Sequence, residues 1–132
     1  MIVIPNSGSA GSIICPSTFT LPGPGGAAVV GSVSAGVALA AVQVISGKPG
    51  EEAGPAPATL VPDETRSKDK STAILTWTFV PSEIYQGILL ICYYGNSGGY
   101  VRFFLPKGTV RCVSKVTDKK GSLTFGSASC SG

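Results

Sequence analysis

The chain has 132 residues with a formal net charge of +3, and only 13% of them are charged. A chain of this length is expected to form one domain that buries roughly two-thirds of its unfolded surface, so it needs no partner to fold. Its 18 glycines and 10 prolines, with many valines, serines and threonines, favour short strands and tight turns over helices. We therefore expect a mainly β protein with little helix, either an antiparallel sheet or sandwich or a small barrel.

The first residues differ from the rest of the chain. Residues 1–14 are uncharged and rich in serine and glycine, which predicts a flexible segment that is ordered only near Ile13 and Ile14. Residues 15–132 are expected to form a single β-rich domain. The start, Met1-Ile-Val-Ile-Pro5, lacks the basic region and the cleavage motif of a signal peptide. If the protein is exported, we expect this sequence to represent a form without its signal peptide.

The chain contains four cysteines, Cys15, Cys92, Cys112 and Cys130. They lack the Cys-x-x-Cys spacing of structural zinc sites, and no histidine is present as a mixed ligand. Disulfide bonds in an oxidising compartment are the preferred interpretation, and four buried free thiols in a cytosolic protein are the alternative. The spacing does not choose among the possible pairings. We expect a disulfide-stabilised protein in the periplasm or secreted.

Residues 27–45 carry no charge, and their length alone would suit a membrane span. The content argues against a span, because small residues dominate and no aromatic or basic anchor lies at the N-terminal side. Val29, Val33, Val37 and Leu39 occupy odd positions, which is the period-2 pattern of a half-buried strand. We predict a strand pair or one bent strand without a membrane span, and the register stays open.

Turns interrupt the middle of the chain. The residues Glu51-Glu52-Ala53 are predicted to form one helical turn on a solvated surface. Residues 63–70 hold six charges of both signs without apolar spacing, which predicts a solvated, flexible loop. Residues 73–80 alternate as in a strand, and Trp77 is expected to face the core.

The C-terminal part alternates apolar runs with turns. After a turn at residues 81–83, the run Ile88–Tyr94 is apolar on both faces and predicts a central strand. Further strands are predicted at residues 100–105, 109–116 and 122–127, with turns at 106–108 and 118–121. If each strand pairs with the next, they form a C-terminal antiparallel meander.

The turn Gly95-Asn-Ser-Gly-Gly99 differs by one letter from the GDSGG around the nucleophile of chymotrypsin-like proteases. A serine nucleophile needs an adjacent base, and the chain has no histidine. Lys107 and Lys115 lie in polar, turn-rich surroundings that keep a lysine charged. Small residues between two apolar runs are typical of a hairpin, so Ser97 is predicted to be a turn residue.

Catalysis has little further support. The carboxylates weighed for it, Glu51, Glu52, Asp63, Glu64 and Glu83, would need to form a pair across a cleft with separated pKa values. We predict that the protein is not an enzyme and uses neither a cofactor nor a metal.

A basic region with neighbouring tyrosines is the candidate binding surface. Between Arg102 and Lys120, six cations accompany a single acid, Asp118, which gives a local charge of +5. Tyrosine and arginine are favoured at protein interfaces, and a basic face attracts acidic partners. The alternative is an ordinary solvated face with tyrosines stacked on a sheet. The candidate surface comprises Tyr93, Tyr94, Asn96, Tyr100, Arg102, Lys107, Arg111 and Lys115.

Several short motifs follow one another along the chain. They are Cys15-Pro16, Ile45-Ser-Gly-Lys-Pro-Gly-Glu51, Leu60-Val-Pro-Asp63, Trp77, Ile91-Cys-Tyr-Tyr94, Leu105-Pro-Lys-Gly-Thr-Val-Arg-Cys112 and Cys130. Their order resembles a family of small exported proteobacterial hypothetical proteins, expected in the periplasm and without an established activity.

The resemblance also implies two disulfide pairs, Cys92 with Cys112 and Cys15 with Cys130. In a flat meander Cys92 and Cys112 would lie about 10 Å apart, which is beyond disulfide reach. The first pair therefore requires the chain after Leu105 to cross back or curl.

These features together predict a non-catalytic exported bacterial protein that binds another protein, as an inhibitor or immunity protein of a periplasmic hydrolase. A structural or small-ligand-binding module of the envelope is the alternative. The partner is expected to have an acidic surface, and nucleic acid is not expected as a partner. The identity of the partner and the oligomeric state stay open.

Overall fold

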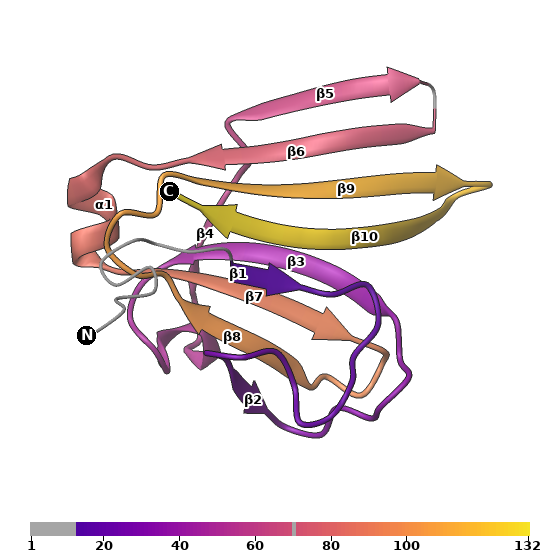
Figure 1. The fold of residues 1–132 in the computed structure, drawn as a ribbon, viewed down its shortest axis with the longest axis horizontal. Helices are drawn as coiled ribbons and strands as arrows, with labels where there is room; N and C mark the ends of the chain where they lie inside the picture. The colour runs from indigo at the N-terminus through magenta and orange to yellow at the C-terminus, as the bar shows by residue number, and fades with distance from the viewer. Residues whose placement is uncertain (1–12, 70) are drawn as a thin grey trace, which may run out of the picture.

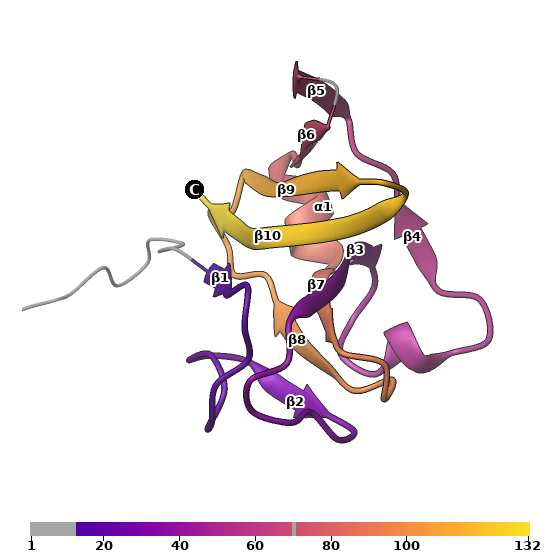
Figure 2. The ribbon, with the colours of Figure 1, turned by 90° about the vertical axis from the view of Figure 1, so that its right-hand side faces the viewer.

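The computed structural model describes residues 13–69 and 71–132, in which ten strands form two antiparallel sheets packed face to face (Figures 1 and 2). Sheet I contains β1 (Ile13–Cys15), β5 (Glu64–Asp69), β6 (Thr72–Thr78), β9 (Arg111–Lys119) and β10 (Ser122–Ser131), in the spatial order β1-β10-β9-β6-β5. Sheet II contains β2 (Ala28–Val30), β3 (Leu39–Ser46), β4 (Ala58–Leu60), β7 (Ile88–Tyr94) and β8 (Tyr100–Phe104), in the order β2-β8-β7-β3-β4. The expected mainly β, disulfide-stabilised sandwich is confirmed. Of the flexible segment expected at residues 1–14, residues 1–12 lie outside the described part, whereas Ile13 and Ile14 belong to β1.

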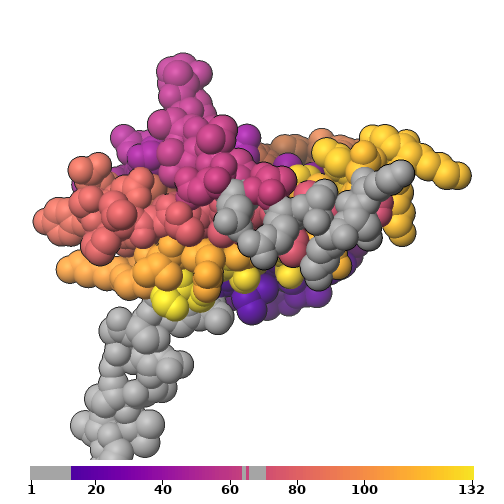
Figure 3. All heavy atoms as spheres, turned by 90° about the horizontal axis from the view of Figure 1, so that it is seen from above, coloured from indigo at the N-terminus to yellow at the C-terminus, as the bar shows by residue number. Residues whose placement is uncertain are grey.

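The strands of sheet I are not all covered along their length. The end of the β9–β10 hairpin projects beyond the body of the sandwich, at the right of Figure 1 and as the yellow extension in Figure 3. Sheet I therefore has one end that packs against sheet II and one end that extends into solvent.

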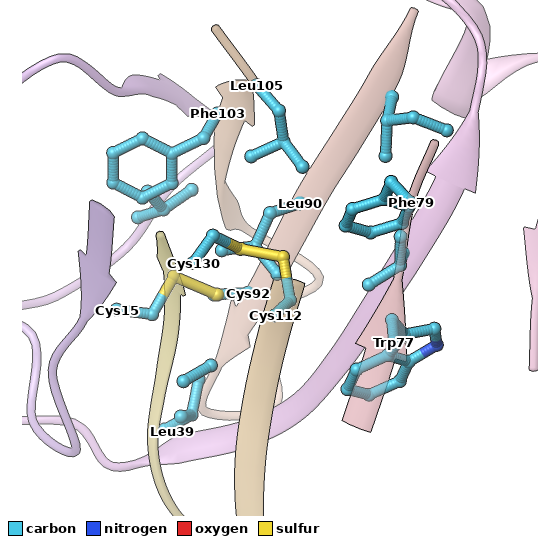
Figure 4. Packing of buried hydrophobic residues seen from close by; sticks show 14 of the residues in the cluster. Cys15, Leu39, Trp77, Phe79, Leu90, Cys92, Phe103, Leu105, Cys112 and Cys130 are labelled. Carbon is cyan, nitrogen blue, oxygen red and sulfur yellow. A yellow bond between two sulfur atoms is a disulfide. The ribbon is translucent and has the colours of Figure 1, made fainter. Parts of the chain in front are cut away.

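The core lies between the sheets and receives side chains from both (Figure 4). Trp77 of β6 is 4% exposed, and its indole Nε1–H donates a hydrogen bond to the carbonyl oxygen of Leu60 at 3.1 Å. The predicted place of Trp77 in the core is confirmed. The hydrogen bond satisfies the polar atom of an otherwise apolar ring, as burial of an indole requires.

Strand β7 is buried on both faces. Leu90 and Cys92 point toward sheet I, Leu89 and Ile91 point away from it, and all four are 0% exposed. A further layer of protein covers each face of this strand, which explains why its apolar run is unbroken. The prediction of a central strand is confirmed, since β7 lies between β8 and β3.

Two disulfide bonds use all four cysteines, and their sulfur atoms lie close together in the core (Figure 4). Cys112 and Cys130 are directly opposite each other on β9 and β10, with 4.0 Å between their Cα atoms. Cys15 of β1 and Cys92 of β7 join the two sheets, with 6.5 Å between their Cα atoms. The pairs implied by the resemblance, Cys92 with Cys112 and Cys15 with Cys130, are therefore wrong. Because the β9–β10 ladder places Cys112 against Cys130, the other two cysteines remain to bridge the sheets.

The last four strands form two hairpins, one in each sheet, where a single meander was expected. β7 pairs with β8 in sheet II, and β9 pairs with β10 in sheet I. The connection at residues 105–110 crosses between the sheets. Stacking two hairpins face to face buries one apolar face of each, which a flat meander of the same strands cannot do.

The charged segment and the following turn also differ from expectation. Residues 64–69 form the edge strand β5, which pairs with β6, and not a loop. A run of charges suits an edge strand because it discourages pairing with other chains.

Residues 81–83 begin a short helix, α1 (Pro81–Gln86), in which Glu83 Oε1 accepts a hydrogen bond from the backbone N–H of Val80 at 2.8 Å. Proline in the first turn and this contact from the third helical residue are typical of a helix start.

Residues 27–45 supply two strands that do not pair with each other. β2 pairs with β8, and β3 pairs with β7. The odd positions do not share one buried face, since Val29 is 42% exposed and Leu39 is 3% exposed. Within the ranges that the structure covers, no helix is long and apolar enough to cross a membrane.

The two disulfides are expected to differ in their effect on stability. Replacing Cys15 and Cys92 by alanine is expected to lower the free energy of unfolding by about 4.5 kcal/mol, because this bridge closes a separation of 77 residues. Replacing Cys112 and Cys130 is expected to lower it by about 3 kcal/mol, because that bridge spans 18 residues. Urea titration of both double variants measures the two values. A larger loss for the Cys112 and Cys130 variant would contradict the loop-length argument.

Candidate functional site

The outer faces of the two sheets differ in how well they are covered. On sheet II, the outward side chains Ile45, Leu89 and Ile91 are at most 1% exposed. On sheet I, Val113 points outward from β9, a strand with neighbours on both sides, and is only half-buried. The outer face of sheet I is therefore open to solvent, whereas that of sheet II carries a second small core.

A buried ion pair closes the second core. Glu52 lies in the 3-10 turn η1 (Glu51–Ala53), and its Oε2 accepts hydrogen bonds from Arg102 Nη1 at 2.7 Å and from the Tyr100 hydroxyl at 2.8 Å. Its Oε1 accepts the backbone N–H of Gly50 at 2.8 Å. The predicted helical turn is confirmed, but Glu52 is 8% exposed and not on a solvated surface. The pair holds the η1 segment against β8.

The same contacts set the ionisation of the cluster. Burial disfavours the charged carboxylate of Glu52, but the hydrogen bonds from Arg102, Tyr100 and the Gly50 N–H outweigh it and lower its pKa to about 2. Burial, together with the hydrogen bond to Glu52 and its negative charge, raises the pKa of Tyr100 to about 12. The cluster therefore stays an ion pair with a neutral tyrosine across the physiological range.

The tyrosines of the candidate surface are held within the fold. The rings of Tyr93 and Tyr100 pack with 5.3 Å between centroids, and the Tyr93 hydroxyl donates to Gln43 Oε1 at 3.3 Å. Tyr94 is 1% exposed and donates a hydrogen bond from its hydroxyl to the Pro16 carbonyl oxygen at 2.6 Å. Tyr94 therefore belongs to the core and to no surface, which corrects its place in the candidate set.

The outer face of sheet I presents a row of cations. Arg111, Lys115 and Lys119 point outward from β9, because Cys112 and Ser114 between them point into the core. They are four residues apart, which corresponds to about 13 Å along a strand. The outward neighbours on β6 and β10 are mostly small and polar, apart from the half-buried Ile74, which lies directly opposite Lys115. The register places beside β9 the outward residues Thr72, Ile74, Thr76, Thr78, Ser122, Thr124, Ser129 and Ser131.

We call this surface, centred on Arg111, Lys115 and Lys119, the basic face. All three side chains are exposed. Among the side chains that the structure describes, Arg102 and Glu52 form the one ion pair, so none of the three cations pairs with a described carboxylate. Their exposure makes them accessible to a partner.

The remaining predicted residues lie elsewhere. Asn96 is exposed in the β7–β8 turn. Lys107 borders a groove of about 340 Å³ between α1 and the β8–β9 connection, which is lined by Pro81, Ile84, Tyr85, Lys107, Thr109 and Val110. The candidate set is thus divided among the second core, the main core, a turn, a groove and the basic face, and it does not form one surface. Lys119 was missed because the strand was expected to end at residue 116.

The serine of the protease-like motif is a structural turn residue. Ser97 Oγ donates a hydrogen bond to the carbonyl oxygen of Ser32 at 2.7 Å and so ties two loops together. Gly99 must be glycine at this contact, because a Cβ there would overlap the same carbonyl group. The predicted hairpin is confirmed.

The described carboxylates that were weighed for catalysis accept hydrogen bonds from backbone N–H groups. Glu51 accepts from Lys48, Glu52 from Gly50, Asp63 from Thr78 and Glu83 from Val80. These contacts give the carboxylates local structural roles at turns and strand ends. In the part of the chain that can be described, no cluster of three or more acidic or sulfur ligands could hold a metal ion.

The Glu52 cluster predicts an acid-sensitive contribution to stability. The pKa of Glu52 is about 2 in the folded protein, against an ordinary value of 4.5. The ion pair therefore stabilises the fold fully above pH 4.5, and this stabilisation is lost as the pH falls toward 2. The contribution is on the order of 3 kcal/mol. Glu52→Gln is expected to lower the free energy of unfolding at pH 7 and to flatten its decline below pH 4.5, as measured by urea titration at several pH values. An unchanged pH profile in the variant would contradict the assignment.

The Ser97 contact gives a second prediction. Ser97→Ala is expected to lower the free energy of unfolding by about 1 kcal/mol through loss of one hydrogen bond, and to leave any activity of the protein unchanged. Gly99→Ala serves as the contrasting variant and is expected to destabilise the hairpin far more. A large loss of activity in a folded Ser97→Ala protein would restore the nucleophile hypothesis.

Comparison with known proteins adds one finding. The family model described as type VI secretion system Tli immunity protein matches residues 34–131 of the chain. This range runs from before β3 to the end of β10 and contains the basic face. No curated protein and no solved structure matches the chain.

Proposed function

This chain belongs to the type VI secretion system Tli immunity protein family, and we propose that it binds a toxic hydrolase effector in the periplasm and prevents it from acting. Family membership supports binding of an effector protein as the function.

The basic face supports the proposal independently of the family match. It is the open side of an ordered five-stranded sheet, and the charged side chains described on β9 there, Arg111, Lys115 and Lys119, are cations without internal partners. Nine residues of β9 at about 3.3 Å each, across strands about 4.8 Å apart, give a surface of roughly 30 Å by 20 Å. An area on the order of 600 Å² approaches the roughly 800 Å² that each partner contributes to a stable complex.

The charge of this face supports an acidic partner surface. Complementary charges raise the association rate and exclude wrong partners, and this effect weakens as salt screens it. We therefore place the effector contact on Arg111 and Lys115, with Lys119 at the far end of the row.

The covalent framework supports tight inhibition. The Cys15–Cys92 bridge joins the sheets, and Cys112–Cys130 crosses two strands of the sheet that carries the basic face. A rigid surface loses little conformational entropy when it binds, so more of the contact energy appears as affinity.

The proposal is tested by asking whether the chain protects a bacterial strain against an effector. Type VI effectors of the producing strain are expressed one at a time in the periplasm of a test strain, with and without this chain. We expect the chain to restore growth against one effector and to purify with it in a defined stoichiometry. If no effector is neutralised or bound, the proposed function is wrong.

Charge reversal tests the surface. Arg111→Glu with Lys115→Glu is expected to slow association with the effector by at least about tenfold at low salt and to reverse its salt dependence, as measured by stopped-flow or surface plasmon resonance. Lys48→Glu changes an exposed lysine outside sheet I and is the matched control. Equal association rates for the double variant and the control would remove the basic face from the interface.

A further inference from the structure

The turn of the β9–β10 hairpin has an unusual backbone. Strand β9 ends at Lys119 and β10 begins at Ser122, so the turn has two central residues, Lys120 with φ 54° and Gly121 with φ 82°. Positive φ at both positions defines a type I′ turn, which suits the twist of a hairpin. Such turns strongly prefer asparagine, aspartate or glycine at the first central position. Lys120 is the one non-glycine residue with positive φ in the described ranges.

Backbone needs do not explain this lysine. Asp118 Oδ1 already accepts the N–H of Gly121 at 3.0 Å, and Gly121 supplies the second positive φ. An asparagine in place of Lys120 would fit the turn better, because its short polar side chain tolerates the left-handed region. An ordinary residue kept in a disfavoured conformation points to a use for its side chain.

The place of the turn indicates what that use is. The hairpin end projects from the sandwich (Figures 1 and 3) and is convex. Lys119 and Lys120 are exposed there without an ion pair among the described residues. Leu123 is 62% exposed and lies opposite Asp118, on the other face of the hairpin from Lys119. A tip with cations on one face and a solvated leucine on the other fits a cleft that surrounds it, with an acidic wall toward Lys119 and an apolar wall toward Leu123.

We propose that the tip formed by Lys119, Lys120 and Leu123 inserts into an acidic cleft of the effector. This inference rests on the proposed function and adds to it that a projecting plug, in addition to a flat face, makes the contact. The tip continues the row of cations on β9, so a partner on the basic face would reach it. A negatively charged hollow concentrates field lines and attracts an exposed ammonium group.

The decisive variant is Lys120→Asn, because it separates stability from binding. The turn accepts asparagine more readily than lysine, so the melting temperature is expected to stay equal or rise. The dissociation constant for the effector recovered in the protection experiment is expected to increase at least about fivefold, as calorimetry measures, because a contact residue is lost. A merely structural role for Lys120 predicts the opposite, unchanged binding.

Further variants complete the test. Lys119→Glu with Lys120→Glu is expected to weaken binding at least about thirtyfold, and Leu123→Ser at least about fivefold. Lys48→Asn is the matched control and is expected to bind like the natural sequence. If the natural sequence binds no effector, the proposed function fails, whereas if it binds and the tip variants bind equally well, only the tip inference fails.

One other partner class must be distinguished. Exposed lysines beside a leucine could also contact an anionic lipid surface. Sedimentation of the effector-free protein with vesicles of anionic phospholipid tests this directly. Binding to vesicles that Lys119→Glu with Lys120→Glu abolishes, together with unchanged effector binding, would overturn the proposal. Absence of sedimentation together with weakened effector binding would support it.

Discussion

The disulfide between Cys15 and Cys92 is the contact on which the arrangement of the two sheets depends. It connects a three-residue strand at the edge of sheet I to the central strand of sheet II, which is buried apart from Tyr93. A strand as short as β1 has few ladder hydrogen bonds and would dock weakly without this link. Once the link is formed, both apolar inner faces are held together, and no described element covers the outer face of sheet I. The open basic face is thus a consequence of how the core is closed.

Much of the fold follows from local patterns in the sequence. The apolar run of β7, the alternation around Trp77 and the glycine-rich turn at Ser97 each identify an element correctly, because strand period and turn chemistry act over a few residues. The features that local patterns miss depend on distant partners. Glu52 is buried because Arg102 and Tyr100, about 50 residues away, neutralise and bind its carboxylate. The cysteine pairing depends on which hairpin enters which sheet, and spacing carries no information about that.

The candidate site shows the same limit. The excess of positive charge between residues 102 and 120 is correct as a count, but the structure separates its members by face and by sheet. Arg102 turns inward to a buried carboxylate, whereas Arg111 and Lys115 remain outward on β9. If the predicted strand had been extended to Lys119, the two-residue period of a strand would have distinguished the outward from the inward residues of β9. No sequence pattern could have shown that Arg102 meets Glu52.

The charged edge strand β5 has a consequence for how this molecule meets others. Sheets commonly recruit a further strand at an open side, and such recruitment joins proteins through main-chain hydrogen bonds that read little of the side-chain sequence. A border of acidic and basic residues hinders that route along β5. At this border, recognition is left to the side chains that point away from the plane of the sheet. A protein that must neutralise one toxin and ignore others gains selectivity from that restriction.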